Sequence, residues 1–163
     1  MVVAEHAGRL PETEAALLKL PGIGPYTAAA ISAIAFGQWT VVVDANIERV
    51  VSRLFAISMP LPQSKPLIRD AMDSITPASR AGDFAQAMMD LGAGICSVRA
   101  PSCLVCPLVF ACDAARLGHP ETYPAKTPKA AKPLPKALSV DDAVQMASFE
   151  GAGNDPWLEA RDA

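Results

Sequence analysis

The spacing of apolar residues along the chain predicts helices and one short extended run. Residues 25–36 are apolar on nearly every face, which indicates a helix buried near the centre of the fold. Gly37 is a natural stop for this helix. Residues 41–43 are three consecutive valines and form the extended run, and a helix with apolar side chains on one face is expected from Asp44 to about Ala56.

Three further helices are predicted. Residues 11–18 are expected to form a short helix with proline and acidic residues in its first turn. A proline-containing loop at 58–66 precedes an amphipathic helix that ends before Pro77. Asp83 and Gln86 have the spacing of a capping box, which predicts the start of another helix. Its expected inward side chains are Phe84, Ala87, Met88 and Leu91, and its expected terminators are Gly92 and Gly94. The expected fold class is all-α.

Composition narrows the class of protein. A chain of 163 residues allows one domain, and 51% hydrophobic with 19% charged residues argues for a globular fold. No apolar run approaches the length of a membrane span, and the first residues lack the features of a signal peptide. We therefore expect a cytoplasmic protein with no membrane partner. The net charge of −3 excludes a generic polyanion binder, so any nucleic-acid site has to be local.

Two glycines mark a candidate backbone site. Residues 20–24 read LPGIG, and Gly22 and Gly24 free the chain for a tight turn and for close approach to another molecule. Pro25 suits the first position of the helix that follows. Free backbone N–H groups before a helix N-terminus form a natural phosphate site, which binds nucleic acid without reading its sequence.

Asp44 is the candidate catalytic carboxylate. It stands where a helix N-cap is expected, and the N–H groups there keep a carboxylate ionised at neutral pH. Near a glycosidic carbon, such a carboxylate stabilises an oxocarbenium-like transition state or helps to activate water. An N-cap without catalytic function is the commoner role of an arbitrary Asp, and both interpretations stay open. Arg49 and Arg53 follow on this helix, and we expect them to face solvent or phosphate.

The cysteines form one cluster in the sequence. Their spacing is C-x6-C-x2-C-x5-C, over Cys96, Cys103, Cys106 and Cys112. Disulfides are not expected in a chain without a secretion signal. Four thiolates suit a structural zinc ion or a [4Fe–4S] cluster, although zinc ribbons show two close pairs and only one occurs here. Spacing alone leaves both open.

Together these motifs resemble the endonuclease III superfamily of helix-hairpin-helix DNA glycosylases. Residues 20–53, which include LPGIG, PYTAAAI and VVDANIERV, are most similar to the adenine glycosylases of the MutY type, and the cysteine spacing is similar to the cluster motif of both families. The resemblance covers about residues 1 to 128. It implies an all-α fold with a partial helix-hairpin-helix glycosylase core over 1–118, which includes an iron–sulfur loop at 96–112.

The resemblance also implies roles for single residues. Asp44 becomes the catalytic aspartate, Gly22 and Gly24 become ligands of DNA phosphate, and Arg99 becomes a contact to the DNA backbone. Tyr26, on the DNA-binding side, stands where bifunctional members carry a Schiff-base lysine; a tyrosine cannot form that imine, which implies a monofunctional enzyme. The four cysteines become ligands of a [4Fe–4S] cluster.

The implied function is base-excision repair. The enzyme would hydrolyse the N-glycosidic bond of adenine mispaired with guanine or 8-oxoguanine in double-stranded DNA, as a monomer associated with the nucleoid in a bacterial-type cytoplasm. The alternatives are an endonuclease III-type pyrimidine glycosylase and lyase, against which Tyr26 argues, and a non-catalytic DNA-binding iron–sulfur module.

The chain also departs from the family pattern. The family's preceding segment, with a glutamate that acts as general acid, and its C-terminal domain that recognises 8-oxoguanine are both missing, so we expect a truncated enzyme with impaired activity. Residues 119–136 are rich in proline and lysine and are expected to form a linker. Residues 137–163 are expected to be a loosely ordered tail with a short helix over 140–149.

Overall fold

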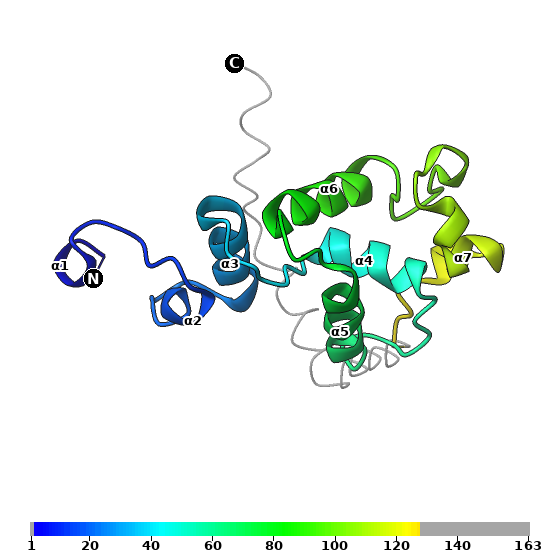
Figure 1. Cartoon of the computed structure of the whole chain (residues 1–163). Coiled ribbons are helices and arrows are strands. Elements are labelled where there is room, and N and C mark those ends of the chain that lie inside the picture. The colour runs from blue at the N-terminus through cyan, green and yellow to red at the C-terminus, as the bar shows by residue number, and fades with distance from the viewer. Residues whose placement is uncertain (1, 128–163) are drawn as a thin grey trace, which may run out of the picture. The chain divides into compact units, whose positions relative to one another are not determined.

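The computed structural model describes residues 2–127 (Figure 1). These residues belong to one compact unit, Met1–Thr127. The expected tail at 137–163, its helix, and the linker beyond residue 127 lie outside the described residues. The first residues of the expected linker belong to the compact unit, since the Leu61 N–H donates to the Ala125 carbonyl at 3.0 Å.

Within residues 2–127 the structure is helical, and the expected all-α class is confirmed. The longer elements are α1 (Val2–His6), α2 (Glu14–Leu17), α3 (Pro25–Ala30), the π-helical turn η1 (Ile31–Ala35), α4 (Ala45–Leu54), α5 (Lys65–Ile75), α6 (Ala81–Gly94) and α7 (Asp113–Arg116). The 3₁₀ turns are η2 (Cys103–Val105), η3 (Val109–Ala111) and η4 (Pro120–Thr122). One isolated bridge, between Leu61 and Lys126, is the only β pairing in this part of the chain. None of these helices has the length and apolar character to cross a membrane.

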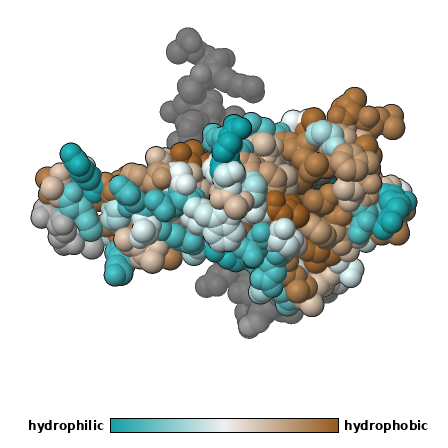
Figure 2. All heavy atoms as spheres, viewed as in Figure 1, coloured by the Kyte–Doolittle hydropathy of each residue, from teal (hydrophilic) through white to brown (hydrophobic). Residues whose placement is uncertain are grey.

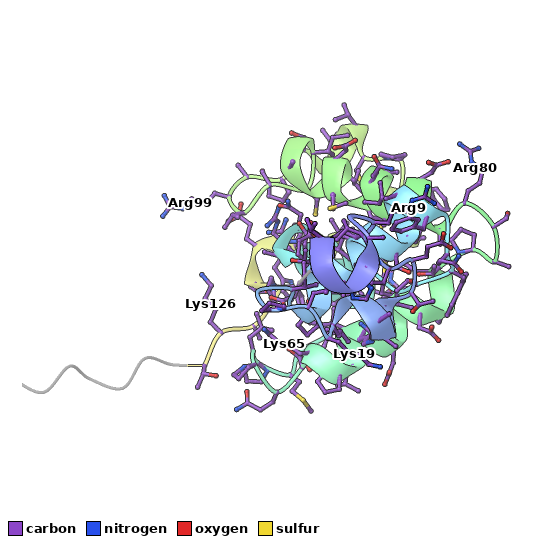
Figure 3. The ribbon with its side chains drawn as sticks, turned by 90° about the vertical axis from the view of Figure 1, so that its left-hand side faces the viewer. Arg9, Lys19, Lys65, Arg80, Arg99 and Lys126 are labelled. Atoms are coloured by element: carbon purple, nitrogen blue, oxygen red, sulfur yellow. The ribbon has the colours of Figure 1, made fainter. Side chains whose placement is uncertain are left out.

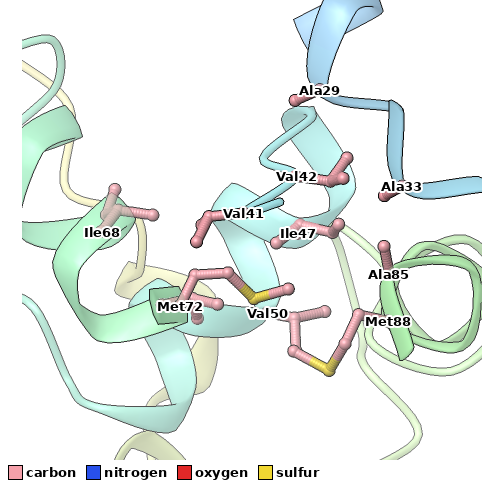
Figure 4. Packing of buried hydrophobic residues seen from close by; sticks show 11 residues of the cluster. Ala29, Ala33, Val41, Val42, Ile47, Val50, Ile68, Met72, Ala85 and Met88 are labelled. Carbon is pink, nitrogen blue, oxygen red and sulfur yellow. The ribbon is translucent and has the colours of Figure 1, made fainter. Parts of the chain in front are cut away.

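Helix α4 lies at the centre of this unit and packs against α5, α6 and α7 (Figure 1). Figure 4 shows Ile68 and Met72 of α5 on one side of α4, and Ala85 and Met88 of α6 on the other. The valine run at 41–43 forms no strand, but its first two side chains enter this core. The carboxylate at the start of α4 is therefore attached to the most buried helix of the fold.

The first helices differ in detail from expectation. Helix α2 begins at Glu14 and not at residue 11, because the Thr13 side chain caps it by accepting from the Ala16 N–H at 3.3 Å. The expected helix at 25–36 is confirmed as α3 continued by η1, and Gly37 follows with φ of 65°. The expectation that this helix is buried on nearly every face is wrong in part, since Tyr26 is 45% exposed and only the small residues of the helix lie in the core.

Helix α6 differs from the sequence-based expectation in three respects. It begins at Ala81, after Arg80 in the left-handed region, and it has no side-chain cap. Asp83 therefore lies in the first turn, where it pairs with Arg80 at 2.6 Å, and the predicted capping box is wrong. The inward face holds Ala85 where Ala87 was expected, because close contacts at two buried glycines fix the rotation of the helix. Those glycines are Gly82 and Gly92, so Gly92 packs inside α6 and does not end it.

Candidate functional site

Asp44 is held at the start of α4 by two hydrogen bonds. Its backbone is extended, with φ of −104° and ψ of −176°, and its Oδ1 accepts from the Ile47 N–H at 2.7 Å. Its Oδ2 accepts from Asn46 Nδ2 at 3.2 Å. The predicted N-cap is confirmed, and the partly buried carboxylate has one fixed orientation with lone pairs still free.

Asn46 and Arg49 connect this carboxylate to the cysteine region. Asn46 Oδ1 accepts from Arg49 Nη2 at 2.9 Å. The same Arg49 nitrogen donates to the Gly92 carbonyl at 2.6 Å, and Arg49 Nε donates to the Cys96 carbonyl at 2.8 Å. The expectation that Arg49 faces solvent or phosphate is therefore wrong in part, since its side chain is half-buried and bonds to internal groups. Each step from Asp44 to Cys96 is a single hydrogen bond between neighbouring groups.

Arg53 lies one helical turn further along α4 and is 1% exposed. Its guanidinium donates to the carbonyls of Tyr123, Cys96, Ser97 and Val98, and to the Cys96 sulfur. The expected exposure of Arg53 is also wrong. Both arginines donate to main-chain carbonyls near the end of α6 and in the segment that follows it, and Arg53 donates to the Tyr123 carbonyl as well.

The four cysteines converge on one hollow. Its empty volume is about 300 Å³, part of it open to solvent, and its other lining residues include Arg53, Pro101 and Val109. All four thiols are free of disulfides and partly buried. Within the described residues no group of three or more His, Cys, Asp or Glu side chains is placed to hold a single metal ion. The cysteines thus share one hollow.

Burial raises the pKa of the Cys103 thiol above its ordinary value, and the charges of the other three cysteines raise it further. The Arg53 guanidinium acts in the opposite direction on the same pKa.

The glycine turn joins α2 to α3. Gly22 has φ of 82°, in the region that favours glycine, as the sequence predicts. Gly24 is the N-cap of α3 with φ of −88°, so its backbone has no such requirement, and nothing in the structure lies within 4 Å of a Cβ placed there. The turn thus leaves open space at Gly24, which permits close approach of another molecule at this point.

Tyr26 and Arg99 lie on different elements. The Tyr26 hydroxyl is directed at the Met89 sulfur at 3.7 Å, so it connects α3 to α6. Arg99 is exposed, and Figure 3 shows its side chain extending away from the body of the molecule. Its loop is held by the Ser97 hydroxyl, which donates to the Arg99 carbonyl at 2.8 Å, and by Glu121, which accepts from the Ala100 N–H at 2.7 Å.

The surface around the cysteine loop is largely apolar. Figure 2 shows apolar residues gathered at the cysteine-bearing end of the molecule, and Leu104 and Phe110 are the most exposed of them.

Sequence reasoning missed Asn46, Arg49 and Arg53 as parts of the site. Their place on the same helix as Asp44 could have indicated a role in the site, but the sequence does not show which of these side chains point inward.

Comparisons with known proteins agree with this arrangement. The helix-hairpin-helix motif family matches residues 5–34. The adenine DNA glycosylase of Arabidopsis thaliana is 42% identical over 140 residues, which cover 80% of this chain and 22% of the relative. The adenine DNA glycosylase of Homo sapiens is 45% identical over 117 residues, which cover 69% of this chain and 21% of the relative. The chain thus spans about a fifth of the length of these two relatives.

Solved structures match the fold as well. A thermostable thymine-DNA glycosylase has a TM-score of 0.64 at 32% identity, covering 71% of this chain and 54% of that one. Endonuclease III in a non-covalent complex with DNA has a TM-score of 0.60 at 28% identity, covering 72% and 54%. By its helix-hairpin-helix motif, its fold and this identity, the matched part of the chain is similar to the helix-hairpin-helix DNA glycosylases of the endonuclease III superfamily and, in sequence, to their adenine-specific MutY-type members.

Proposed function

We propose that this chain contributes to base-excision repair as a glycosylase that hydrolyses the N-glycosidic bond of adenine opposite guanine or 8-oxoguanine. The observation that carries the proposal is the Asp44 carboxylate, which the Ile47 N–H and the Asn46 amide orient at the start of α4. The identity to adenine DNA glycosylases, 42% and 45% for the two relatives, supports the choice of base.

Asp44 performs the electrostatic part of the reaction. Adenine departs with a proton taken from solvent and leaves positive charge on the sugar; a preorganised carboxylate beside it stabilises the oxocarbenium-like transition state, and water then adds to the anomeric carbon and releases a proton. Asn46 holds Oδ2 and Ile47 holds Oδ1, so the carboxylate needs little reorganisation when that charge develops. Tyr26 has no amine with which to form a Schiff base, so the product is an abasic site in an unbroken strand.

DNA binding is assigned to the glycine turn and to the cysteine loop. The backbone N–H groups from Gly22 to the start of α3 suit a phosphate, and the open space at Gly24 admits one. Arg99 adds a cationic side chain on a loop held in place by Ser97 and Glu121. Since the net charge of the chain is −3, these local contacts have to supply the attraction. The target adenine is then flipped out of the duplex.

The cysteines fit a [4Fe–4S] cluster better than a single zinc ion. Cys96, Cys103, Cys106 and Cys112 line one hollow, and no three of them are placed as ligands of one ion. Four thiolates around one hollow suit an iron–sulfur group, and the C-x6-C-x2-C-x5-C spacing has one close pair where zinc ribbons have two. Such a group, when bound, supplies cross-links that close the loop at 96–112 and keep Arg99 in position.

Single-turnover excision tests the function. The substrate is a duplex with adenine opposite 8-oxoguanine, analysed with and without alkali. Strand breaks only after alkali, lost in Asp44→Asn but retained in Gly94→Ala, support the proposal. Breaks without alkali indicate lyase chemistry of the endonuclease III type. Duplex binding without excision indicates a non-catalytic module.

A second measurement tests the cofactor. Iron and sulfide analysis with a visible absorption spectrum is expected to find a cluster. Stoichiometric zinc without a chromophore contradicts the cofactor assignment.

A further inference from the structure

Arg53 is the most thoroughly bonded buried charge among the described residues. Its Nε donates to the Tyr123 carbonyl at 3.1 Å, its Nη1 to the Ser97 carbonyl at 2.6 Å, and its Nη2 to the Val98 carbonyl at 3.1 Å. Nη1 also lies 3.2 Å from both the carbonyl and the sulfur of Cys96. These contacts use all three guanidinium nitrogens.

No carboxylate balances this charge within residues 2–127. The ion pairs in this part of the chain are Arg69 with Glu14, Arg80 with Asp83, and Arg116 with Asp113, all at the surface. Carbonyl groups satisfy hydrogen bonds but carry no net charge, and a buried guanidinium without an opposite charge is costly. Among the described residues, the acceptors of the Arg53 guanidinium are main-chain carbonyls and the Cys96 sulfur, and of these atoms the sulfur can become negative.

Arg53 also borders the space shared by the other cysteines. It lines the hollow on which all four thiols converge, and the Cys112 sulfur lies 3.5 Å from the Arg53 carbonyl. Four thiolates bring four negative charges into this space, so Arg53 and the thiolates each supply the charge that the other lacks.

We propose that Arg53 is the buried counter-charge of the four-thiolate centre and raises the reduction potential of the iron–sulfur group held there. The proposal rests on the cluster assignment made above. A positive charge close to the group stabilises its more negative, reduced form, and an N–H bond to a ligand sulfur acts in the same direction. Arg53 is a positioning and tuning residue, since its contacts are to a ligand and to the loop and not to the DNA.

Two variants and one control separate charge from packing. Arg53→Gln removes the charge and keeps an amide donor, and Arg53→Lys keeps the charge but loses the planar fork. Arg116→Gln removes an equal charge from an exposed position on α7, close to Cys112 in the sequence. Far-ultraviolet circular dichroism and iron content show which variants fold and hold the cluster.

The readout is the one-electron reduction potential, measured without DNA by titration at an electrode and followed by visible absorption. Arg53→Gln is expected to lower the reduced-to-oxidised ratio at a fixed potential at least tenfold, which corresponds to about 59 mV. Arg53→Lys is expected to stay close to wild type, and Arg116→Gln is expected to match it because solvent screens an exposed charge.

The outcomes are distinct. A folded, cluster-bearing Arg53→Gln with an unchanged potential overturns the inference alone. Where Arg53→Gln does not hold the cluster, Arg53→Lys decides: a wild-type potential supports the counter-charge, and a lowered one overturns it. Zinc in the wild-type protein overturns both this inference and the cluster assignment. Failure of adenine excision with a normal cluster overturns the proposed reaction and leaves the inference standing.

Discussion

Gly92 of α6 lies directly against Asn46 of α4. A Cβ placed on Gly92 would lie 2.7 Å from the Asn46 Cβ and 3.1 Å from the Asn46 carbonyl oxygen. The Gly92 carbonyl accepts from Arg49 Nη2 at 2.6 Å in the same region. The absence of a side chain at position 92 therefore lets α6 approach α4 closely enough for the Gly92 carbonyl to accept from Arg49.

Gly92→Ala is expected to destabilise the fold. The added methyl group forces α6 away from Asn46, and overpacking of this kind costs about 1–3 kcal/mol, partly offset by the better helix propensity of alanine. Gly94→Ala is the matched control, since nothing lies within 4 Å of its Cβ on the same helix. Urea denaturation measures both, and equal stability of the two variants would contradict the close approach.

Gly82→Ala is expected to cost more than Gly92→Ala. A Cβ at Gly82 would lie 2.4 Å from the Ala33 carbonyl oxygen and 2.8 Å from its carbon, and backbone atoms give way less readily than a side chain. We expect a loss of about 3 kcal/mol, at the upper end of the usual overpacking range. A thermal midpoint above that of Gly92→Ala would show that η1 shifts freely.

Two substitutions at Asp44 are expected to separate capping from catalysis. Asn and Asp are equally good N-caps, so Asp44→Asn is expected to keep the stability of α4 while excision is lost. Asp44→Ala removes the acceptor for the Ile47 N–H and is expected to cost about 1 kcal/mol as well. Denaturation curves and single-turnover excision measure the two effects; retained excision in Asp44→Asn would remove the catalytic role.

Cys103 is expected to react slowly with iodoacetamide in the folded, metal-free protein. The reactive species is the thiolate, and burial together with the neighbouring cysteines raises the pKa of this thiol above its ordinary value. A smaller fraction is thus ionised at a given pH than in the unfolded chain, and the rate rises only at higher pH. Mass spectrometry of labelled peptides against pH, with a urea-unfolded control, measures the midpoint. An identical midpoint in both states would contradict the raised pKa.

The sequence by itself determined the elements and the chemistry that depends on local pattern. The glycine turn needs a positive φ at Gly22, and Asp44 caps α4 with its own side chain, so short-range sequence is enough to predict both. The amphipathic α5 follows from the spacing of its apolar residues, and the four cysteines are close enough in sequence to suggest one centre.

Tertiary structure decided which polar residues serve the site. Arginine usually faces solvent, but Arg49 and Arg53 donate to carbonyls of the chain after α6. The position of those carbonyls depends on how α6 packs on α4. That packing depends in turn on Gly82 and Gly92, whose role as contact points requires partners far away in the sequence. The local sequence pattern specifies where a helix begins and which of its faces is apolar. The separation and rotation of two helices are set by side chains from both, and no stretch of one helix contains that information.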